Sequence, residues 1–266
     1  MRSPLIFGAQ GQLGSELARL LPDAPVRGVR IQDPEAVKAV FAHRRPDVVF
    51  NCAAYNAVDQ AEREPEVAMA SNADGPMVLA AACRRAGATL VHFSTNFVFD
   101  GTLDRPYVES DEPAPQSAYA RSKLAGEQRV LESGALSLVI RTAALYGRQS
   151  GFPRRIERRA REGGPVDVVS DQRVNPTFVR DLALVTVALV DQGVLGIVHA
   201  AGGGCCGWDE FAAAVLEELG LGNHVVPVET GRYPAPAVRP RNGCMESTRI
   251  PPLRPWREAL REALTP

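Results

Sequence analysis

The sequence predicts an α/β fold in which helices cover both faces of a doubly wound parallel sheet. Short apolar runs alternate with helical patterns as far as residue 200, and this alternation is typical of strand–helix–strand units. Three spaced glycines directly follow the first apolar run, where such folds turn from strand to helix. After Ala201 the alternation stops, so we expect the tail to form a small C-terminal lobe.

The first elements can be assigned from their apolar patterns and from the residues that end them. Residues 5–7 are expected to form a buried strand, and residues 15–21 a helix with leucines on one face. Residues 26–31 are a weaker second strand, and residues 34–43 form a helix that ends before Pro46.

The middle of the chain continues this alternation. Residues 47–51 are apolar in succession, as a strand buried on both faces requires. An alanine-rich helix is expected at 69–86, because Gly87 marks its end. A strand at 89–93 and a helix at 118–131 follow.

The later elements fall into two groups. A strand at 136–141, a helix at 181–191 and a short strand at 196–200 complete the predicted sheet. The tail holds a helix at 208–219, a proline-rich stretch at 227–240 and a final helix near Trp256. A lobe of this kind can close one side of a ligand cleft at the carboxyl ends of the strands.

Composition narrows the classes of partner. The net charge of -1 gives no global attraction to nucleic acid or to anionic membranes. The apolar runs are too short to span a bilayer, and the N-terminus enters a strand without a secretory leader, so a cytoplasmic protein is expected. An arginine-rich run at 154–161 is interpreted as a solvated helix face, with a phosphate-facing patch as the alternative.

The cysteines and histidines give no sign of a metal site. The five cysteines are odd in number and have no C-x-x-C spacing, and the four histidines are dispersed. We therefore expect free thiols in a reducing cytosol and no bound metal.

The glycine-rich turn predicts a dinucleotide site. Gly8, Gly11 and Gly14 are spaced so that the chain turns tightly, approaches a pyrophosphate and packs closely on the sheet. The helix that follows offers free N–H groups to the phosphates. The fold is therefore expected to be Rossmann-like.

Two arginines bear on the choice of cofactor. Arg27 and Arg30 lie at the second predicted strand, where an arginine can accommodate a 2′-phosphate. This favours NADPH, while solvated arginines, and hence NADH, remain an open alternative.

The reaction centre is predicted from Tyr119 and Lys123. Their four-residue spacing puts both side chains on one helix face, where the ammonium is expected to lower the phenol pKa. Such a phenol can give a proton to a carbonyl that is being reduced. Ser94 and Thr95 stand at a strand end, where a hydroxyl can orient that carbonyl, although Ser94 can equally cap the chain reversal.

The sequence resembles the extended short-chain dehydrogenase/reductases over nearly its whole length. The resemblance is carried by the glycine-rich turn and by residues 51–62, 94–101 and 119–127, with further matches at 141–147, 171–177, 239–242 and 255–260. Within this family the resemblance is closest to the reductases that act on dTDP-linked 4-keto-6-deoxy sugars in deoxysugar and rhamnose biosynthesis.

This resemblance implies roles for particular residues. Thr95, Tyr119 and Lys123 would be catalytic. The cofactor would contact Gly8, Gln10, Gly11, Gln12, Leu13, Gly14, Arg30, Ala53, Ala54, Tyr55, Ser94, Tyr119 and Lys123, and the nucleotide-sugar substrate would contact Asn96, Phe97, Ala144, Asn175, Thr177 and Arg239. The cofactor-binding domain would comprise residues 1–147 and 172–200, and the substrate-binding lobe residues 148–171 and 201–266. A homodimer is left open.

The chain departs from the family pattern in the substrate pocket. Asn96 and Phe97 stand where the family usually has Asp and Tyr, and Ala144 stands where it has a tryptophan. A related sugar therefore remains an alternative substrate.

Two other classes of function were weighed. A non-catalytic dinucleotide-binding regulator would gain nothing from a phenol tuned by a lysine. A sugar epimerase or dehydratase of the same superfamily is the other alternative, but dehydratases carry an acidic pair after the threonine, and here Asn96 and Phe97 follow.

Overall fold

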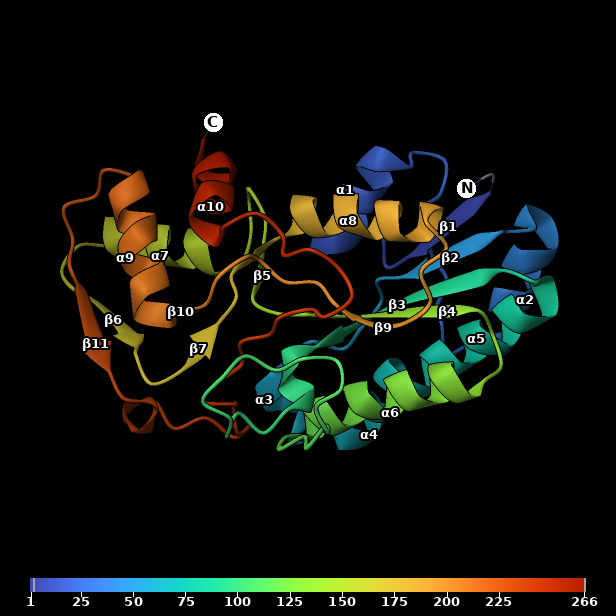
Figure 1. The fold of residues 1–266 in the computed structure, drawn as a ribbon, viewed down its shortest axis with the longest axis horizontal. Coiled ribbons are helices and arrows are strands. Elements are labelled where there is room, and N and C mark those ends of the chain that lie inside the picture. Colours follow the sequence, from blue (N-terminus) through green and yellow to red (C-terminus); the bar gives the residue numbers. More distant parts are fainter. Residues whose placement is uncertain (2, 266) are drawn as a thin grey trace.

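The computed structural model describes residue 1 and residues 3–265, and its centre is a parallel sheet (Figure 1). The sheet has five strands in the order β1-β2-β3-β4-β9. They are β1 (Pro4–Phe7), β2 (Val48–Asn51), β3 (Thr89–Thr95), β4 (Ser137–Thr142) and β9 (Gly196–His199). All four pairings between neighbours are parallel.

Helices cover both faces of this sheet, which confirms the doubly wound prediction (Figure 1). One face carries α1 (Gln12–Leu20) and α8 (Val179–Asp191), and the other carries α2 (Pro34–Arg44), α5 (Gly75–Ala86) and α6 (Ala118–Glu132). Successive side chains of β1 point to opposite faces of the sheet, so the strand packs against both helix layers. Ile6 belongs to the apolar cluster with α1 and α8, while Leu5 and Phe7 belong to the cluster with α2 and α5.

The prediction of a strand at 26–31 is wrong. This segment touches the sheet only at its start, through a bridge between Ile6 and Pro25 and a bond from the Val26 N–H to the Ile6 carbonyl. Pro25 has no N–H to donate to a ladder, and Gly28, at φ +69°, turns the chain away. After β1 the chain passes along one edge of this strand at Pro25 and then crosses to β2, which pairs with the opposite edge of β1. The order in which the chain adds segments to the sheet therefore reverses at β1.

The alanine-rich helix is longer than predicted and is interrupted. It begins with α4 (Pro65–Met69), passes through a π-helical turn at Ala70–Asp74 and continues as α5. Asn72 in this turn is buried, and its side chain bonds the Tyr55 backbone and the Ser122 hydroxyl. The turn therefore joins the loop after β2 to the helix α6. A short helix, α3 (Val58–Ala61), lies between β2 and α4.

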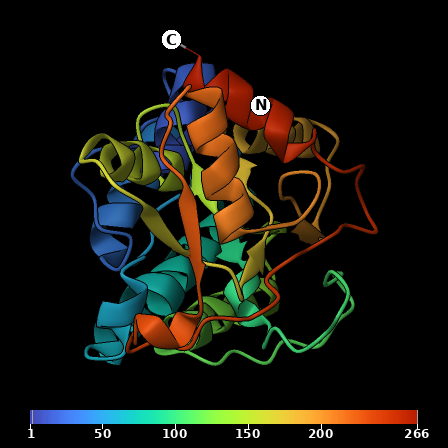
Figure 2. The ribbon, with the colours of Figure 1, turned by 90° about the vertical axis from the view of Figure 1, so that its left-hand side faces the viewer.

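A second group of elements packs beside the carboxyl ends of the sheet strands (Figure 2). Its helices are α7 (Phe152–Arg161), α9 (Trp208–Glu218) and α10 (Trp256–Leu264). Three small two-stranded sheets pair β6 (Val166–Val169) with β11 (Val225–Val228), β7 (Arg173–Val174) with β10 (Cys206–Gly207), and β5 (Leu145–Tyr146) with β8 (Thr177–Phe178). These strands are not expected from the sequence.

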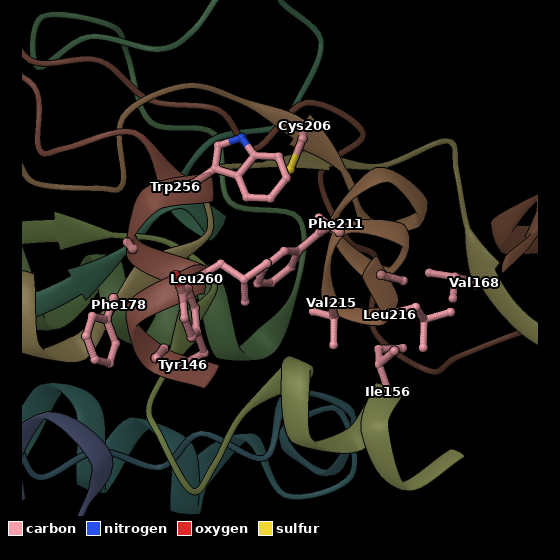
Figure 3. Close-up of a cluster of buried hydrophobic side chains, with 14 of the residues drawn as sticks. Tyr146, Ile156, Val168, Phe178, Cys206, Phe211, Val215, Leu216, Trp256 and Leu260 are labelled. Carbon is pink, nitrogen blue, oxygen red and sulfur yellow. The ribbon is translucent and has the colours of Figure 1, made fainter. Parts of the chain in front are cut away.

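An aromatic cluster holds this group together (Figure 3). The Phe211 ring of α9 lies 5.4 Å from the Tyr146 ring and 5.6 Å from the Trp256 ring, measured between centroids. Tyr146 also stacks on Phe178, 5.7 Å away. The cluster therefore joins α9 and α10 to the β5–β8 pair, which leads back to the central sheet.

The cysteines differ from the prediction of free thiols. Cys205 and Cys244 form a disulfide, with their Cα atoms 5.9 Å apart, while Cys52, Cys83 and Cys206 are free. The two segments meet because β10 pairs with β7 and the Gly243 N–H donates to the Arg173 carbonyl. Such long-range pairing leaves no signal in cysteine spacing.

Within residue 1 and residues 3–265, no helix combines the length and the apolar character needed to cross a membrane.

Candidate active site

The candidate active site lies at the carboxyl ends of β1 to β4. A cavity of about 540 Å³, here called the reaction cavity, lies there beside β1, where the order of the strand connections reverses. Doubly wound sheets bind their ligands at such a reversal. Its predicted lining residues are Gly11, Gln12, Leu13, Gly14, Ala53, Ala54, Ser94, Thr95, Asn96, Phe97, Tyr119, Lys123 and Ala144. Thirteen predicted residues from five separate segments therefore meet here.

The glycine-rich turn forms one wall of the reaction cavity. Gly8 has φ +76°, and a Cβ there would lie 2.4 Å from the Ala53 nitrogen. A Cβ at Gly14 would lie 2.2 Å from the Gly8 carbonyl oxygen. Gly11 caps α1 without a side-chain bond, so the first N–H groups of this helix face the cavity. This uncapped helix end fits the pyrophosphate of a dinucleotide.

A second cavity of about 270 Å³ adjoins the glycine turn and shares Ala53 and Ala54 with the reaction cavity. The predicted residues Gly8, Gln10 and Arg30 line it, and Arg27 does as well. Because two guanidinium groups border this end, it fits the adenosine side of a dinucleotide, including one with a 2′-phosphate.

Tyr119 is held in the first turn of α6. The Ser117 hydroxyl caps this helix by accepting from the Ala120 N–H, and the Glu62 carboxylate accepts from the Ala118 N–H at 2.6 Å. The phenol donates to Asn56 Oδ1 over 3.5 Å. The bonds to Ser117 and Glu62 therefore fix the backbone that carries the tyrosine.

The pKa of Tyr119 departs from the expected direction. Burial raises it to about 12, and a hydrogen bond with Thr95 opposes this only in part. Lys123 is not among the causes of this shift in the ligand-free protein, so the predicted lowering is absent there. The Lys123 ammonium donates to the Phe93 carbonyl at 2.6 Å. A phenol with this pKa stays protonated at neutral pH and keeps a proton to give.

Lys123 is buried in the wall of the reaction cavity. Burial lowers its pKa to about 8, and the nearby charge of Glu127 opposes the shift. The Lys123 ammonium is therefore close to its titration point near neutral pH.

Hydroxyl and amide groups border the tyrosine at the end of β3. Thr95 Oγ1 donates to Asn96 Oδ1 at 3.3 Å and accepts from the Phe97 N–H at 3.2 Å. The Asn96 amide donates to the Gly243 carbonyl at 3.0 Å, which ties this corner to the C-terminal segment. The Ser94 hydroxyl is buried without a partner among the described residues, so it can bond a ligand.

Ala144 lies in the reaction cavity with an unusual backbone. Its φ is +43°, in the left-handed region that favours glycine, and its carbonyl accepts from the Thr177 N–H at 3.2 Å. Non-glycine residues in this conformation cluster at functional sites.

A third cavity of about 350 Å³, here called the lobe cavity, adjoins the reaction cavity and shares Asn96 and Phe97 with it. Its walls include the aromatic residues Phe152, Trp208 and Tyr233 and two arginines, Arg155 and Arg239. The predicted residue Arg239 therefore lies in this cavity. Arg155 comes from the arginine-rich run, in which Arg154 and Arg161 pair with Glu157, and Arg159 pairs with Glu162.

Three predicted residues, Tyr55, Asn175 and Thr177, line none of these three cavities. Thr177 is fully buried, and its hydroxyl donates to the Asn175 carbonyl. The Asn175 amide donates to the carbonyls of Gly202 and Gly204. Tyr55 points to Glu64, where its hydroxyl donates at 2.5 Å.

Several site residues were missed by the sequence reasoning. Asn56, which accepts from the Tyr119 hydroxyl, lies inside the quoted stretch 51–62 and could have been found from polarity beside a strand end. Trp208 and Phe152 carried no such signal, because they reach the lobe cavity only through the packing of α7 against α9.

Fold and site together are those of an extended short-chain dehydrogenase/reductase: a doubly wound sheet, a glycine-rich turn at a helix N-terminus, and a tyrosine and lysine on one helix face beside a strand-end threonine. The whole sequence, residues 1–266, matches the family described as RmlD substrate binding domain, and the chain belongs to that family.

Relatives and solved structures agree with this assignment. The chain is 44% identical over 280 residues to dTDP-4-dehydrorhamnose reductase of Mycobacterium tuberculosis, covering 98% of this chain and 91% of the relative. It is 42% identical over 277 residues to the probable dTDP-4,6-dihydroxy-2-methyloxan-3-one 4-ketoreductase of Streptomyces antibioticus, covering 97% and 93%. The crystal structure of dTDP-4-dehydrorhamnose reductase from Bacillus anthracis in complex with NADP is 33% identical, with a TM-score of 0.94 and 98% of each chain covered.

Proposed function

We propose that this protein is an NADPH-dependent reductase that converts the C4 ketone of a dTDP-linked 4-keto-6-deoxy sugar to an alcohol. The observation that carries the proposal is the position of Tyr119 in a cavity that is lined by the glycine-rich turn and adjoins the lobe cavity. The names of the relatives, reductases of dTDP-linked keto sugars, supply the substrate class.

Thr95, Tyr119 and Lys123 are the proposed catalytic residues. The bound nicotinamide supplies the hydride that reaches C4. Tyr119 gives its proton to the ketone oxygen, and Thr95 orients that oxygen. The Lys123 ammonium, which donates to the Phe93 carbonyl in the ligand-free protein, is proposed to stabilise the phenolate that forms during turnover. Solvent then returns a proton to the phenolate.

The lobe cavity suits the nucleotide part of the substrate. Aromatic rings of Trp208, Phe152 and Tyr233 can pack on a base, and the guanidinium groups of Arg155 and Arg239 can bond a diphosphate. This supports a substrate-binding lobe at residues 148–171 and 201–266, beside a cofactor-binding domain at 1–147 and 172–200.

NADPH is the proposed cofactor, and NADH is expected to bind as well. Arg27 and Arg30 support NADPH, as does the NADP bound in the relative from Bacillus anthracis. A homodimer, a cytoplasmic location and the lack of a nucleic-acid partner stay predictions.

The proposal is tested by following NADPH oxidation with dTDP-4-dehydrorhamnose and with dTDP-4-keto-6-deoxy-D-glucose. We expect oxidation that depends on the sugar nucleotide and is lost in Tyr119→Phe. No oxidation with either sugar, by enzyme that still binds NADPH, would contradict the proposed substrate class.

A further inference from the structure

Asp59 and Arg239 join the two sides of the substrate cleft. Asp59 lies on α3, directly after the loop that follows β2, whereas Arg239 belongs to the C-terminal segment that runs past α3 (Figure 1). Arg239 Nη2 donates to Asp59 Oδ2 at 2.7 Å, and Nη1 donates to Oδ1 at 3.1 Å. A two-point pair of this kind fixes the plane of the guanidinium.

The same carboxylate also holds the backbone of the segment. The Ala237 N–H donates to Asp59 Oδ1 at 3.3 Å, and Arg239 Nη1 donates to the Ala237 carbonyl at 3.0 Å. Asp59 therefore fixes both the guanidinium and the turn that carries it. The hydrogen bonds from the Arg239 side chain hold the Asp59 pKa below its usual value, so the carboxylate stays ionised at neutral pH.

Arg239 keeps donors free for a ligand. A guanidinium has five N–H groups, and those of Arg239 make three bonds among the described residues, none of them from Nε. Its side chain is 27% exposed and lines the lobe cavity. An arginine oriented in this way, with unused N–H groups at an aromatic cavity, is suited to bond a phosphate oxygen.

Arg155 provides a second cation at the same cavity. Its guanidinium lies 5.9 Å from the centre of the Phe152 ring, and no carboxylate pairs with it among the described residues. The Asp59–Arg239 pair has no net charge, so the free charge comes from Arg155, while Arg239 contributes directed donors.

We propose that Asp59 is a positioning residue that aims Arg239 at the diphosphate of the substrate. This inference rests on the proposed function, because it takes a nucleoside diphosphate as the occupant of the lobe cavity. Asp59 itself touches no substrate. It acts by keeping the guanidinium at the cavity wall before the ligand arrives, so less rotamer freedom is lost on binding.

The test compares dTDP with thymidine, which lacks the phosphates, by calorimetric titration. Asp59→Asn keeps the size of the side chain but removes the charge that holds Arg239. We expect the Kd of dTDP to rise about tenfold, as for loss of one charge-assisted hydrogen bond, with the Kd of thymidine and of NADPH unchanged. In turnover, KM for the sugar nucleotide should rise while kcat at saturation stays the same.

Two further variants control the result. Asp111→Asn breaks another two-point pair, with Arg105, away from all three cavities of the site, and should leave both ligands unaffected. Arg239→Ala should weaken dTDP, and Asp59→Asn/Arg239→Ala should weaken it no further, because Asp59 acts only through Arg239.

Two results would overturn the inference. Unchanged or tighter dTDP binding in Asp59→Asn would show that the carboxylate does not aim the arginine, or that it repels the phosphates. Equal weakening of dTDP and thymidine would indicate a general loss of the cavity. Failure of the wild-type protein to bind dTDP would contradict the proposed function itself. That outcome differs from the two above, because it is seen in the wild type and does not depend on the variants.

Discussion

Tyr119 carries most of the proposed chemistry at the scale of single residues. Its pKa of about 12 means that the ligand-free phenol is protonated, as a proton donor must be. Tyr119→Phe removes that proton and keeps the ring that meets Phe97 edge to face at 5.7 Å. We expect kcat to fall about 10²–10⁴-fold with NADPH affinity retained. Near-normal turnover would remove Tyr119 from the mechanism.

Lys123 predicts a pH dependence of the rate. Burial lowers its pKa to about 8, so the ammonium is present below that pH and lost above it. Since the charge stabilises the developing phenolate, kcat/KM should fall as pH rises through about 8. A pH–rate profile checks this, and a rate that stays level well above pH 8 speaks against an acting ammonium.

Ala144 bears on which sugar is preferred. The resemblance to the family implies a tryptophan at this position, and here a small side chain lines the reaction cavity instead. Loss of a packed aromatic typically costs about 3–5 kcal/mol in a closed site. We expect wild type to show a high KM for dTDP-4-dehydrorhamnose and Ala144→Trp to lower it. Efficient turnover by wild type, abolished by the tryptophan, would refute this expectation.

The buried pair Arg141–Glu127 anchors the catalytic helix at the scale of elements. Glu127 on α6 accepts from Arg141 on β4 at 2.7 Å, and both side chains are at most 2% exposed. Glu127→Gln leaves the arginine charge buried without its partner, which should lower the free energy of unfolding by about 3–5 kcal/mol. Urea denaturation measures this. Lys38→Gln, which breaks an exposed pair on α2, should change little, and equal effects in both variants would contradict the anchoring role.

The elements also show what a single sequence can reveal. The strand predicted at 89–93 and the helix predicted at 118–131 lie within two residues of β3 and α6, because apolar runs and helical spacing are local signals. The strand at 26–31 was predicted from apolar residues alone, but Pro25 and Gly28 prevent a ladder. The Tyr119–Lys123 pair was found by helical spacing, whereas Asp59 and Arg239 meet across 180 residues of chain.

Cofactor choice belongs to the whole molecule, because it depends on the cavity between β1 and the segment at 26–32. Arg27 and Arg30 line this cavity, so NADPH should bind at least as tightly as NADH. Exposed charges of this kind contribute roughly 1–2 kcal/mol at most, so discrimination should be modest. Titration of both cofactors on Arg27→Ala and Arg30→Ala should show weaker NADPH binding and unchanged NADH binding. Unchanged NADPH affinity in both variants would make these arginines ordinary surface residues.

The proposed reaction delivers hydride to C4 of a dTDP-linked keto sugar in the reaction cavity. It is tested most directly by using NADPH deuterated at the transferring position of the nicotinamide and locating the label in the sugar product by NMR. The account predicts deuterium at C4 of the sugar, in an amount equal to the NADPH consumed. Deuterium at another carbon, or NADPH consumption without label in the sugar, would contradict it.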